Sequence, residues 1–419
     1  MKSLLLCLAI THVTVINTSG PIVHDATIVV RDGRIADIGN IAVPPDAQVV
    51  DGRGRFLIPG LWDMHVHLSW TTASALPVLV ANGVTTVRDM GSRLGEIDEW
   101  RTKIASSLIT GPRIFRVGPI LNGQKFNQYQ MVPGNPDETR GVARALKEVG
   151  VDFLKVHRRL PRDSYLALID EAKKLGIDVV GHIPMTVSPE EASNAGQATI
   201  EHTDTLFEGT FSTAHKDENL AAAIRHFGED GEAERLFRVF VKNHTVFDPT
   251  LAAWLSVTTD QLASDPHMRY VAASNRKAIT PITPQDRQNY RDTFAEFLKI
   301  VGIAHRSGVT LITGTDIAGP RIPGFSLHDE LALLVDCGLT PLEALQAATI
   351  TPANIVGKAK ELGSIDRGKI ADFVLLDANP LDDIHNTQKI NAVIVGGRLL
   401  RRADLDALFK QSEELASQR

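Results

Sequence analysis

The chain has 419 residues, of which 43% are hydrophobic and 22% are charged, and its formal net charge is −6. This length accommodates one large α/β domain with a smaller satellite, and the composition excludes wholesale disorder. The acidic balance gives no general attraction to phosphate backbones, so nucleic acid is not an expected partner. The two cysteines, Cys7 and Cys337, exclude a disulfide framework and a cysteine-rich zinc site.

The amino-terminal segment has two interpretations. Lys2 is followed by an apolar run to Ile10 that resembles a short signal peptide, but the run lacks a small-residue cleavage site. Residues 10–16 alternate apolar and polar side chains as a strand does. We therefore expect a strand to begin here, which favours a cytoplasmic protein over an exported one. No apolar run reaches the ~20 residues of a membrane span, so none is expected.

Alternating segments near both ends of the chain predict a small β domain. The first two flank Asp32-Gly33, a pair typical of a tight hairpin turn. We expect one β-sandwich domain assembled from residues 1–56 and from residues 359–419, the latter including a tail. The alternating runs cover residues 26–30, 34–39, 371–376 and 392–395.

Residues 57–358 alternate strand-like and helix-like segments. Eight such repeats predict a parallel sheet closed into a (β/α)8 TIM barrel. A doubly wound open sheet is the alternative, but no glycine-rich phosphate turn follows the first strand. Residues 254–300 are too long for one crossover helix, so we expect a helical excursion or lid there. The predicted strands lie at residues 60–67, 84–87, 114–117, 153–156, 178–180, 198–200, 246–247 and 309–312.

Two helices within the barrel have recognisable starts. Ser188 and Thr340 each precede a proline, and a glutamate follows three residues after each hydroxyl side chain. This is the pattern of a capping box with proline in the first helical position. We expect a helix to begin at each site.

His65 and His67 lie at the end of the first predicted barrel strand. Side chains at positions i and i+2 of a strand point the same way, so both imidazoles are expected to face the barrel interior. Barrels of this type keep their active sites at this end of the strands. Two neutral imidazoles suit zinc, nickel, cobalt or iron. Taken alone, the pair is also compatible with histidines that serve only the core.

Three more candidate ligands fall at predicted strand ends. His182, His202 and Asp316 each follow a short apolar run. Each has an ordinary alternative, as a buried histidine bonded to the backbone or as an aspartate capping the next helix. Their shared location at the carboxyl ends of strands favours a metal site instead.

Lys155 lies at the end of the fourth predicted strand. An inward-facing amine there is buried near other cations, and both effects disfavour its charged form. A neutral lysine amine can add carbon dioxide, and the two oxygens of the resulting carbamate could bridge two metal ions. The alternatives are a lysine that faces outward or one paired with a carboxylate.

Together these residues resemble the amidohydrolase superfamily. Two segments strengthen the resemblance: PGLWDMHVH at residues 59–67 and GSIDRGKIAD at residues 363–372, with Gly314-Thr315-Asp316 between them. Within the superfamily, the chain is most similar to the imidazolonepropionase-like and Xaa-Pro-dipeptidase-like (prolidase-like) branch. The similarity covers nearly the whole length, and it implies the same barrel and split β-sandwich.

The resemblance implies two divalent ions, with Zn2+ the first choice. A water shared by the ions would act as the nucleophile, and Asp316 would take its proton and pass it to the departing amine. Lys155 is implied to be carboxylated and to bridge the ions. The implied ligands of one ion are His65, His67, Lys155 and Asp316, and those of the other are Lys155, His182 and His202.

Three further residues are candidates for substrate contact. His157 lies two residues beyond Lys155 and on the same predicted face. His328 opens the helix after the eighth predicted strand, and Tyr129 follows the third. The alternative for each is a structural or loop role.

The sequence thus predicts a metal-dependent hydrolase that cleaves the C–N amide bond of dipeptides or N-acyl amino acids, aromatic amino-acid amides among them. One alternative is a hydrolase of cyclic amides such as imidazolones or lactams. Another is a non-catalytic barrel relative that only binds, against which the intact ligand set argues. Deamination is disfavoured because no carboxylate follows His182 at the expected offset. The expected partner is a small amide or dipeptide, and the resemblance allows a homo-oligomer.

Overall fold

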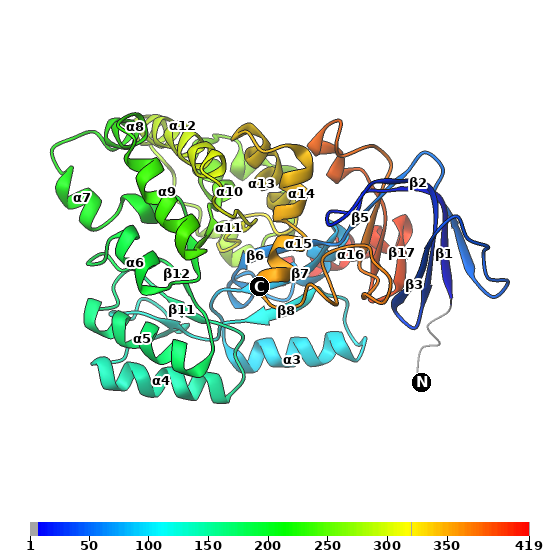
Figure 1. The fold of residues 1–419 in the computed structure, drawn as a ribbon, viewed down its shortest axis with the longest axis horizontal. Coiled ribbons are helices and arrows are strands. Elements are labelled where there is room, and N and C mark those ends of the chain that lie inside the picture. Colours follow the sequence, from blue (N-terminus) through cyan, green and yellow to red (C-terminus); the bar gives the residue numbers. More distant parts are fainter. Residues whose placement is uncertain (1–6, 320, 419) are drawn as a thin grey trace.

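The computed structural model describes residues 7–319 and 321–418, which form a barrel and a sheet built from both ends of the chain (Figure 1). The blue amino-terminal and red carboxy-terminal strands lie together at the right of Figure 1. Most of the signal-like run lies outside the described residues, and the chain is a strand from Leu8 onward. The sheet contains β1 (Leu8–Val15), β2 (Val23–Arg31), β3 (Arg34–Gly39), β4 (Gln48–Asp51), β5 (Phe56–Pro59), β15 (Phe373–Leu376), β16 (Ile390–Val395) and β17 (Arg398–Arg401).

This sheet folds back on itself into a sandwich-like unit. Its order is β17-β16-β15-β5-β1-β2-β3, with β4 beside β1, and β5 joins the two ends of the chain. Ile35 N donates to Lys369 O at 2.9 Å and Ala371 N donates to Gly33 O at 2.9 Å, so the β2–β3 hairpin reaches the segment before β15. β5 extends across residue 56, the first boundary of our proposed domain division. The enclosed core includes Ile10, Ile28, Leu57, Phe373 and Ile394.

The barrel strands form two parallel arcs. β6, β7 and β8 make one arc, and the other has the order β10-β9-β11-β12-β13-β14. Asp152 N donates to Arg116 O at 2.8 Å and links the arcs on one side. The strands are β6 (Leu61–Val66), β7 (Val84–Asp89), β8 (Arg113–Arg116), β9 (Ile120–Leu121), β10 (Gln130–Met131), β11 (Leu154–Val156), β12 (Val179–Gly181), β13 (Thr199–Glu201) and β14 (Val246–Asp248).

The eighth predicted strand closes the ring without forming a regular ladder. Residues 309–312 contain only an isolated bridge between Leu311 and Phe247. Met64 N nevertheless donates to Thr313 O at 2.8 Å, so this segment connects β14 to β6. A Cβ at Gly314 would lie 2.3 Å from a carboxylate oxygen of Asp248, so only glycine lets the chain pass here. The prediction therefore located the segment correctly but overstated its regularity.

Helices surround the barrel, and the predicted excursion between β14 and residue 309 is helical, from α10 to α12. None of the described helices has the length and apolar character needed to cross a membrane. The α-helices are α1 (Leu68–Thr71), α2 (Ala75–Ala81), α3 (Leu94–Ala105), α4 (Pro136–Glu148), α5 (Arg162–Leu175), α6 (Pro189–Ala195), α7 (Thr210–Ala214), α8 (Leu220–Glu229), α9 (Glu232–Asn243), α10 (Leu251–Thr258), α11 (Ala273–Lys277), α12 (Pro284–Arg306), α13 (Phe325–Asp336), α14 (Pro341–Ala347), α15 (Ile350–Ile355) and α16 (Arg402–Ser417). The 3-10 turns are η1 (Asp204–Phe207), η2 (Leu262–Ser264), η3 (Pro266–Tyr270) and η4 (Ile384–Gln388).

One of the two predicted capping boxes is complete. Thr340 Oγ1 accepts from Glu343 N, and the Glu343 carboxylate accepts from Thr340 N at 2.7 Å. Ser188 caps α6 by accepting from Glu191 N at 3.1 Å, but the Glu191 carboxylate accepts from Arg162 instead of returning to the cap. The prediction of a second full box was wrong because a neighbouring helix supplies a charged partner.

Candidate metal centre

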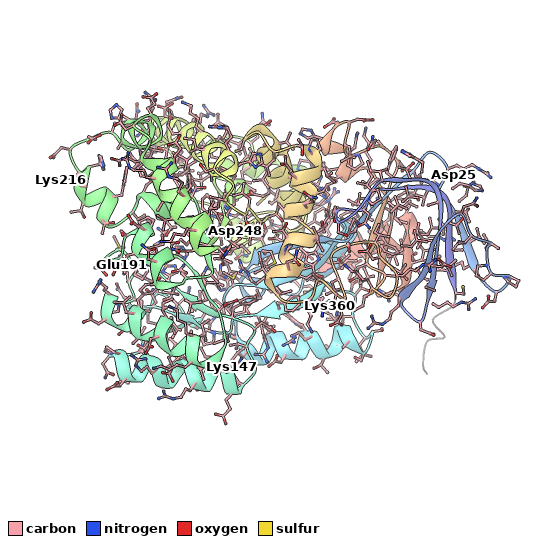
Figure 2. The ribbon with its side chains drawn as sticks, viewed as in Figure 1. Asp25, Lys147, Glu191, Lys216, Asp248 and Lys360 are labelled. Carbon is pink, nitrogen blue, oxygen red and sulfur yellow. The ribbon has the colours of Figure 1, made fainter. Side chains whose placement is uncertain are left out.

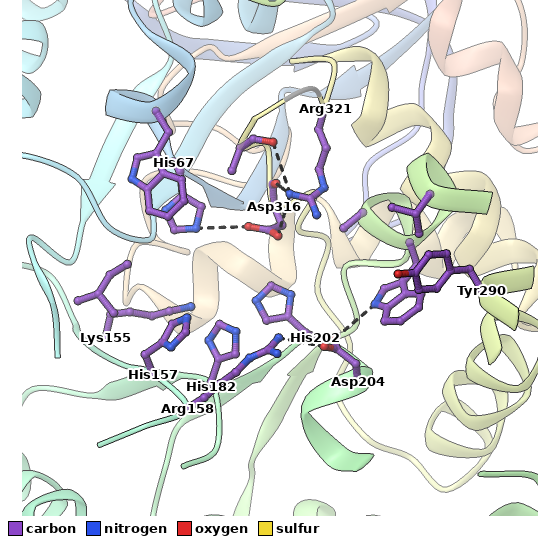
Figure 3. A pocket seen from close by; sticks show the side chains of 16 residues that line it. His67, Lys155, His157, Arg158, His182, His202, Asp204, Tyr290, Asp316 and Arg321 are labelled. Atoms are coloured by element: carbon purple, nitrogen blue, oxygen red, sulfur yellow. Dashed lines mark hydrogen bonds and ion pairs between the residues drawn. The ribbon is translucent and has the colours of Figure 1, made fainter. Parts of the chain in front are cut away.

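A cavity of about 370 Å3 lies at the carboxyl ends of the barrel strands (Figure 3). His67, His157, His182 and Lys155 lie on one side of Figure 3, and Tyr290 of α12 lies on the other. The cavity is lined by His67, Trp70, Ile120, Lys155, His157, Arg158, His182, His202, Asp204, Ala253, Trp254, Val257, Tyr290, Asp316, Ala318 and Arg321.

Three of the four histidines predicted as ligands, His67, His182 and His202, line this cavity, and His65 is fully buried beside them. The ring centroids of His65 and His67 are 5.3 Å apart, those of His65 and His202 are 4.6 Å apart, and those of His182 and His202 are 4.5 Å apart. Burial, followed by the charge of Lys155, lowers the pKa of His65 to about 3. Burial likewise holds the pKa values of His182 and His202 well below the ordinary value. The imidazoles of His65, His182 and His202 are therefore neutral, which is the form that binds a metal ion.

Hydrogen bonds orient two of these rings. His67 Nδ1 donates to Gly91 O at 3.2 Å, and His202 Nδ1 lies 2.8 Å from Thr250 Oγ1. Donation to the Gly91 carbonyl leaves the lone pair of His67 on Nε2, whereas the Thr250 hydroxyl can donate to or accept from His202 Nδ1. Fixing one ring nitrogen in this way sets the tautomer and the direction in which the other nitrogen binds.

Asp316 faces the histidine pair from the opposite side. Its carboxylate lies 3.3 Å from His67 Nε2, and Arg321 approaches the other oxygen at 3.2 Å (Figure 3). The carboxylate also lies 3.6 Å from His65 Nε2. Burial raises the pKa of this carboxyl, but the charge of Arg321 and the His67 contact outweigh that effect and hold it well below the usual value. Asp316 is thus an anion at neutral pH.

Lys155 points into the same space from β11. The residue is 1% exposed, and its Nζ has no hydrogen-bond partner among the described residues. Burial is the main reason that its pKa falls to about 8, so an appreciable fraction of the amine is neutral near physiological pH. Gly181 makes room for the chain, because a Cβ there would lie 2.8 Å from Lys155 Cδ.

The donor set fits a metal site. Three of its buried nitrogens have no hydrogen-bond partner in the described part of the chain: His65 Nε2, Lys155 Nζ and His182 Nδ1. Unpaired buried polar atoms cost free energy, and several in one place call for a ligand or ion. Ligand atoms of His65, His202 and Asp316 also lie within 4.8 Å of one another. Nitrogen and carboxylate donors of this kind suit zinc and similar divalent ions.

A charged network beneath the histidines was missed by the sequence analysis. Arg88 donates to Glu201 at 2.8 Å, and Glu201 also lies 3.2 Å from His65 Nδ1. Asp248 adds a second buried carboxylate, which Figure 2 places in the interior whereas Lys147 projects from the surface. Burial and the neighbouring Glu201 raise the pKa of Asp248 well above its usual value. Two features of the sequence could have indicated this network: Glu201 directly precedes His202, and Asp248 lies at a strand end.

The structure places the three candidates for substrate contact in different surroundings. His157 lines the cavity, with its ring centroid 4.2 Å from that of His182. Tyr129 stacks on Trp70 just behind the lining and bonds to Ser69 O. His328 lies elsewhere: its ring nitrogens contact Asn82 O at 3.1 Å and Thr387 Oγ1 at 2.9 Å. The structure thus gives His328 a packing role.

The cavity mouth contains an ion-pair cluster that the sequence analysis also missed. Arg158 pairs with Asp204 at 2.9 Å and with Glu208. Trp254 Nε1 donates to the other oxygen of Asp204 at 3.3 Å. These contacts hold the α10 indole against the strand-end loops, so the wall of the cavity depends on residues far apart in the sequence.

Residues 56–400 match the amidohydrolase family. The chain belongs to this family. The match confirms the resemblance inferred from the ligand motifs and makes the chain a metal-binding hydrolase of amide bonds. The imidazolonepropionase of Symbiobacterium thermophilum is 26% identical over 388 residues, which cover 85% of this chain and 84% of that relative.

Solved structures confirm the TIM barrel with its separate β domain. A Bifidobacterium longum protein provisionally described as a prolidase is 27% identical and has a TM-score of 0.73, covering 98% of this chain and 100% of its own. A Xaa-Pro dipeptidase with methionine bound in its active site is 22% identical, with a TM-score of 0.72 over 94% of this chain and 100% of that one. At 22% identity, the similarity to the dipeptidase shows a shared fold alone.

Proposed function

We propose that the cavity holds two divalent ions, with Zn2+ as the first choice, and cleaves amide bonds of dipeptides or N-acyl amino acids. The observation that carries the proposal is the convergence of buried nitrogens without hydrogen-bond partners among the described residues, and of one carboxylate, at the strand ends. One ion would be held by His65, His67, Lys155 and Asp316, and the other by Lys155, His182 and His202.

Lys155 is the residue that favours two ions over one. Its Nζ lies in a buried space among histidines, without a carboxylate partner. The lowered pKa supports reaction of the neutral amine with carbon dioxide. The resulting carbamate would offer two oxygen ligands to the ions and would add negative charge beside them.

The ions would supply a water of lowered pKa and would polarise the substrate carbonyl. Asp316 would accept the proton of that water and then give it to the departing amine. His157 is neutral because burial, followed by Lys155, lowers its pKa to about 3, so it can donate one hydrogen bond to the substrate. Its position beside His182 suits the scissile carbonyl.

The composition of the cavity supports the substrate class. Arg158 and Arg321 line the cavity, and although both pair with carboxylates, the Nε of each makes no hydrogen bond among the described residues. These free donors suit the carboxylate of a dipeptide or N-acyl amino acid. Trp254, Val257 and Tyr290 also line the cavity and add apolar surface, which suits a bulky or aromatic side group. A substrate with both features fills both parts of the cavity.

Hydrolysis of a cyclic amide is the second candidate function. The similarity to an imidazolonepropionase over 85% of this chain favours it. Cyclic and linear amides need the same ions and the same proton transfer, and they differ in how the carboxylate and the side group are held.

A substrate screen tests the proposal. Zinc-reconstituted protein is assayed against a library of dipeptides and N-acyl amino acids and against imidazolone and lactam substrates, with Asp316→Asn as the background control. We expect turnover on the linear amides with a carboxylate beside the scissile bond. Turnover confined to cyclic amides would select the second function, and turnover confined to lactones or phosphotriesters would overturn the amide proposal.

A further inference from the structure

A second cavity lies between the barrel and the terminal sheet. Its volume is about 760 Å3, compared with about 370 Å3 for the cavity at the metal centre. It is bounded by the end of α3, the loop into β8 and the β16–β17 turn, and it shares no lining residue with the metal-centre cavity. Thr85 and Arg113 stand at the beginnings of β7 and β8, so this cavity lies at the opposite end of the barrel from the histidines.

The charged lining of this cavity is entirely basic. Arg101, Arg113 and Arg398 all line it, and the lining contains no acidic residue. Arg398 donates to Thr110 Oγ1 at 2.7 Å and has no carboxylate within ion-pair distance among the described residues. Arg113 and Arg101 are each 3.6 Å from a carboxylate oxygen, Asp372 and Asp98 respectively. These long contacts leave guanidinium donors available to a ligand.

Two buried polar atoms of the lining residues lack partners. Arg113 Nε and Thr85 Oγ1 make no hydrogen bond within the part of the chain that the structure describes. Thr85 is 1% exposed, so its hydroxyl cannot be satisfied by bulk water. Unpaired groups of this kind beside a cavity indicate a polar ligand.

Apart from Thr85, Ser107 and Thr110, the rest of the lining is apolar or glycine. Isoleucines from α3, the following loop and β8 line the cavity together with Ala105, Pro112 and Val395 of the terminal sheet. The isoleucines are Ile104, Ile109 and Ile114. Ligand sites commonly combine a hydrophobic lining with a few polar groups in a volume of about 300–1,000 Å3.

We propose that this cavity binds a small amphiphilic organic anion, with its carboxylate, sulfonate or phosphate-ester head on Arg113 and Arg398 and its apolar body on the isoleucines. The bound anion would contact both the barrel and the terminal sheet. Binding would therefore raise the thermal midpoint of the folded chain, because a ligand that binds only the native state stabilises it.

Isothermal titration calorimetry with 1-naphthalenesulfonate tests the proposal on the full chain. We expect saturable binding, with a weaker interaction for inorganic phosphate, which has the charge without the apolar body. Arg398→Ala and Arg113→Gln should each weaken the affinity for the sulfonate by roughly tenfold, the loss typical of one charge-assisted hydrogen bond. Ala105→Trp should abolish binding by filling the cavity without changing any charge.

Two control variants test whether 1-naphthalenesulfonate binds at this cavity and not elsewhere on the chain. Arg235→Ala removes an exposed arginine of α9, and Arg158→Ala removes a guanidinium at the metal-centre cavity. Neither should change the affinity. Absence of saturable binding to the native chain would overturn the proposal, as would an affinity that falls in Arg158→Ala but not in Arg398→Ala. These readouts do not depend on amide turnover, so they stand apart from the proposed function.

Discussion

Asp316 stands where a proton must be moved, and its backbone suits an asparagine replacement. Its φ of +50° lies in the left-handed region, which asparagine and aspartate tolerate better than other side chains. We therefore expect Asp316→Asn to fold normally and to keep most of its bound metal. Removing a general acid–base group typically lowers kcat by about 10²–10⁴-fold. The measurement is kcat on the best substrate of the screen, with metal content by mass spectrometry.

The control for this variant is Asp217→Asn on the surface, which should leave both quantities unchanged. Unchanged turnover in Asp316→Asn would exclude the proton-transfer role. A kcat loss that exactly follows metal loss would reassign Asp316 to metal binding alone.

Lys155 offers the sharpest test of the two-ion proposal. Replacing it with alanine removes the bridging carbamate, so we expect fewer than two ions per chain and loss of turnover. Wild-type protein prepared with ¹³C-bicarbonate should show a carbamate carbon by NMR, and the variant should not. Lys147→Ala, on the exposed face of α4, is the matched control. Two tightly bound ions in Lys155→Ala would contradict the carbamate bridge.

At the scale of strands, local pattern predicted where several side chains lie, while their role as ligands stays a prediction. His67, Lys155, His182 and His202 line the cavity because they lie at or directly after strand ends, and His65 lies in β6 two residues before His67. The Arg88–Glu201 pair could not be predicted in this way, since its residues are brought together only when the barrel closes. The same holds for Arg158, whose partners lie in a 3-10 turn.

Whether a predicted barrel segment forms a regular strand was the property that the sequence predicted least well. β9 and β10 have two residues each, too few for any periodicity to be visible. The segment before Gly314 has a strand-like composition, but contact with Asp248 and His65 controls its path. In both cases tertiary contacts, absent from local sequence, decide the outcome.

Glu330 of α13 connects two elements and should make stability depend on pH. Its carboxylate accepts from Ala252 N at 2.6 Å, at the start of α10, and burial raises its pKa to about 8. The unfolded chain, with a pKa near the ordinary 4.5, releases this proton earlier than the folded chain does. The contribution of Glu330 to stability is therefore fully present below pH 4.5 and is lost as the pH rises toward 8.

Glu330→Gln removes this titration while keeping an acceptor for Ala252. One pKa unit corresponds to about 1.4 kcal/mol, so the slope of unfolding free energy against pH should become measurably flatter between pH 5 and 8. Urea unfolding at several pH values makes the comparison, with Glu343→Gln, at the exposed cap of α14, as the control. Parallel slopes for wild type and Glu330→Gln would show that the carboxyl is ionised in the fold.

At the scale of the whole molecule, the metal centre joins parts of the barrel that few backbone bonds connect. Its proposed ligands lie in or directly after β6 in one arc, in or directly after β11, β12 and β13 in the other, and in the irregular segment at Asp316 that closes the ring. Ions held by all of these elements should stabilise the closed barrel, and their removal should leave several buried nitrogens unpaired.

We expect chelation to lower the thermal midpoint and addition of Zn2+ to restore it. A ligand at one hundred times its Kd contributes about 2.7 kcal/mol to the stability of the native state, so the shift should amount to several degrees. Differential scanning calorimetry of chelated, zinc-loaded and Mg2+-supplemented protein makes the measurement, and Mg2+ should restore little because it prefers oxygen ligands. Lys155→Ala should show a smaller zinc-dependent rise than wild type. Equal midpoints for chelated and zinc-loaded wild-type protein would show that no native-state site of useful affinity joins these strands.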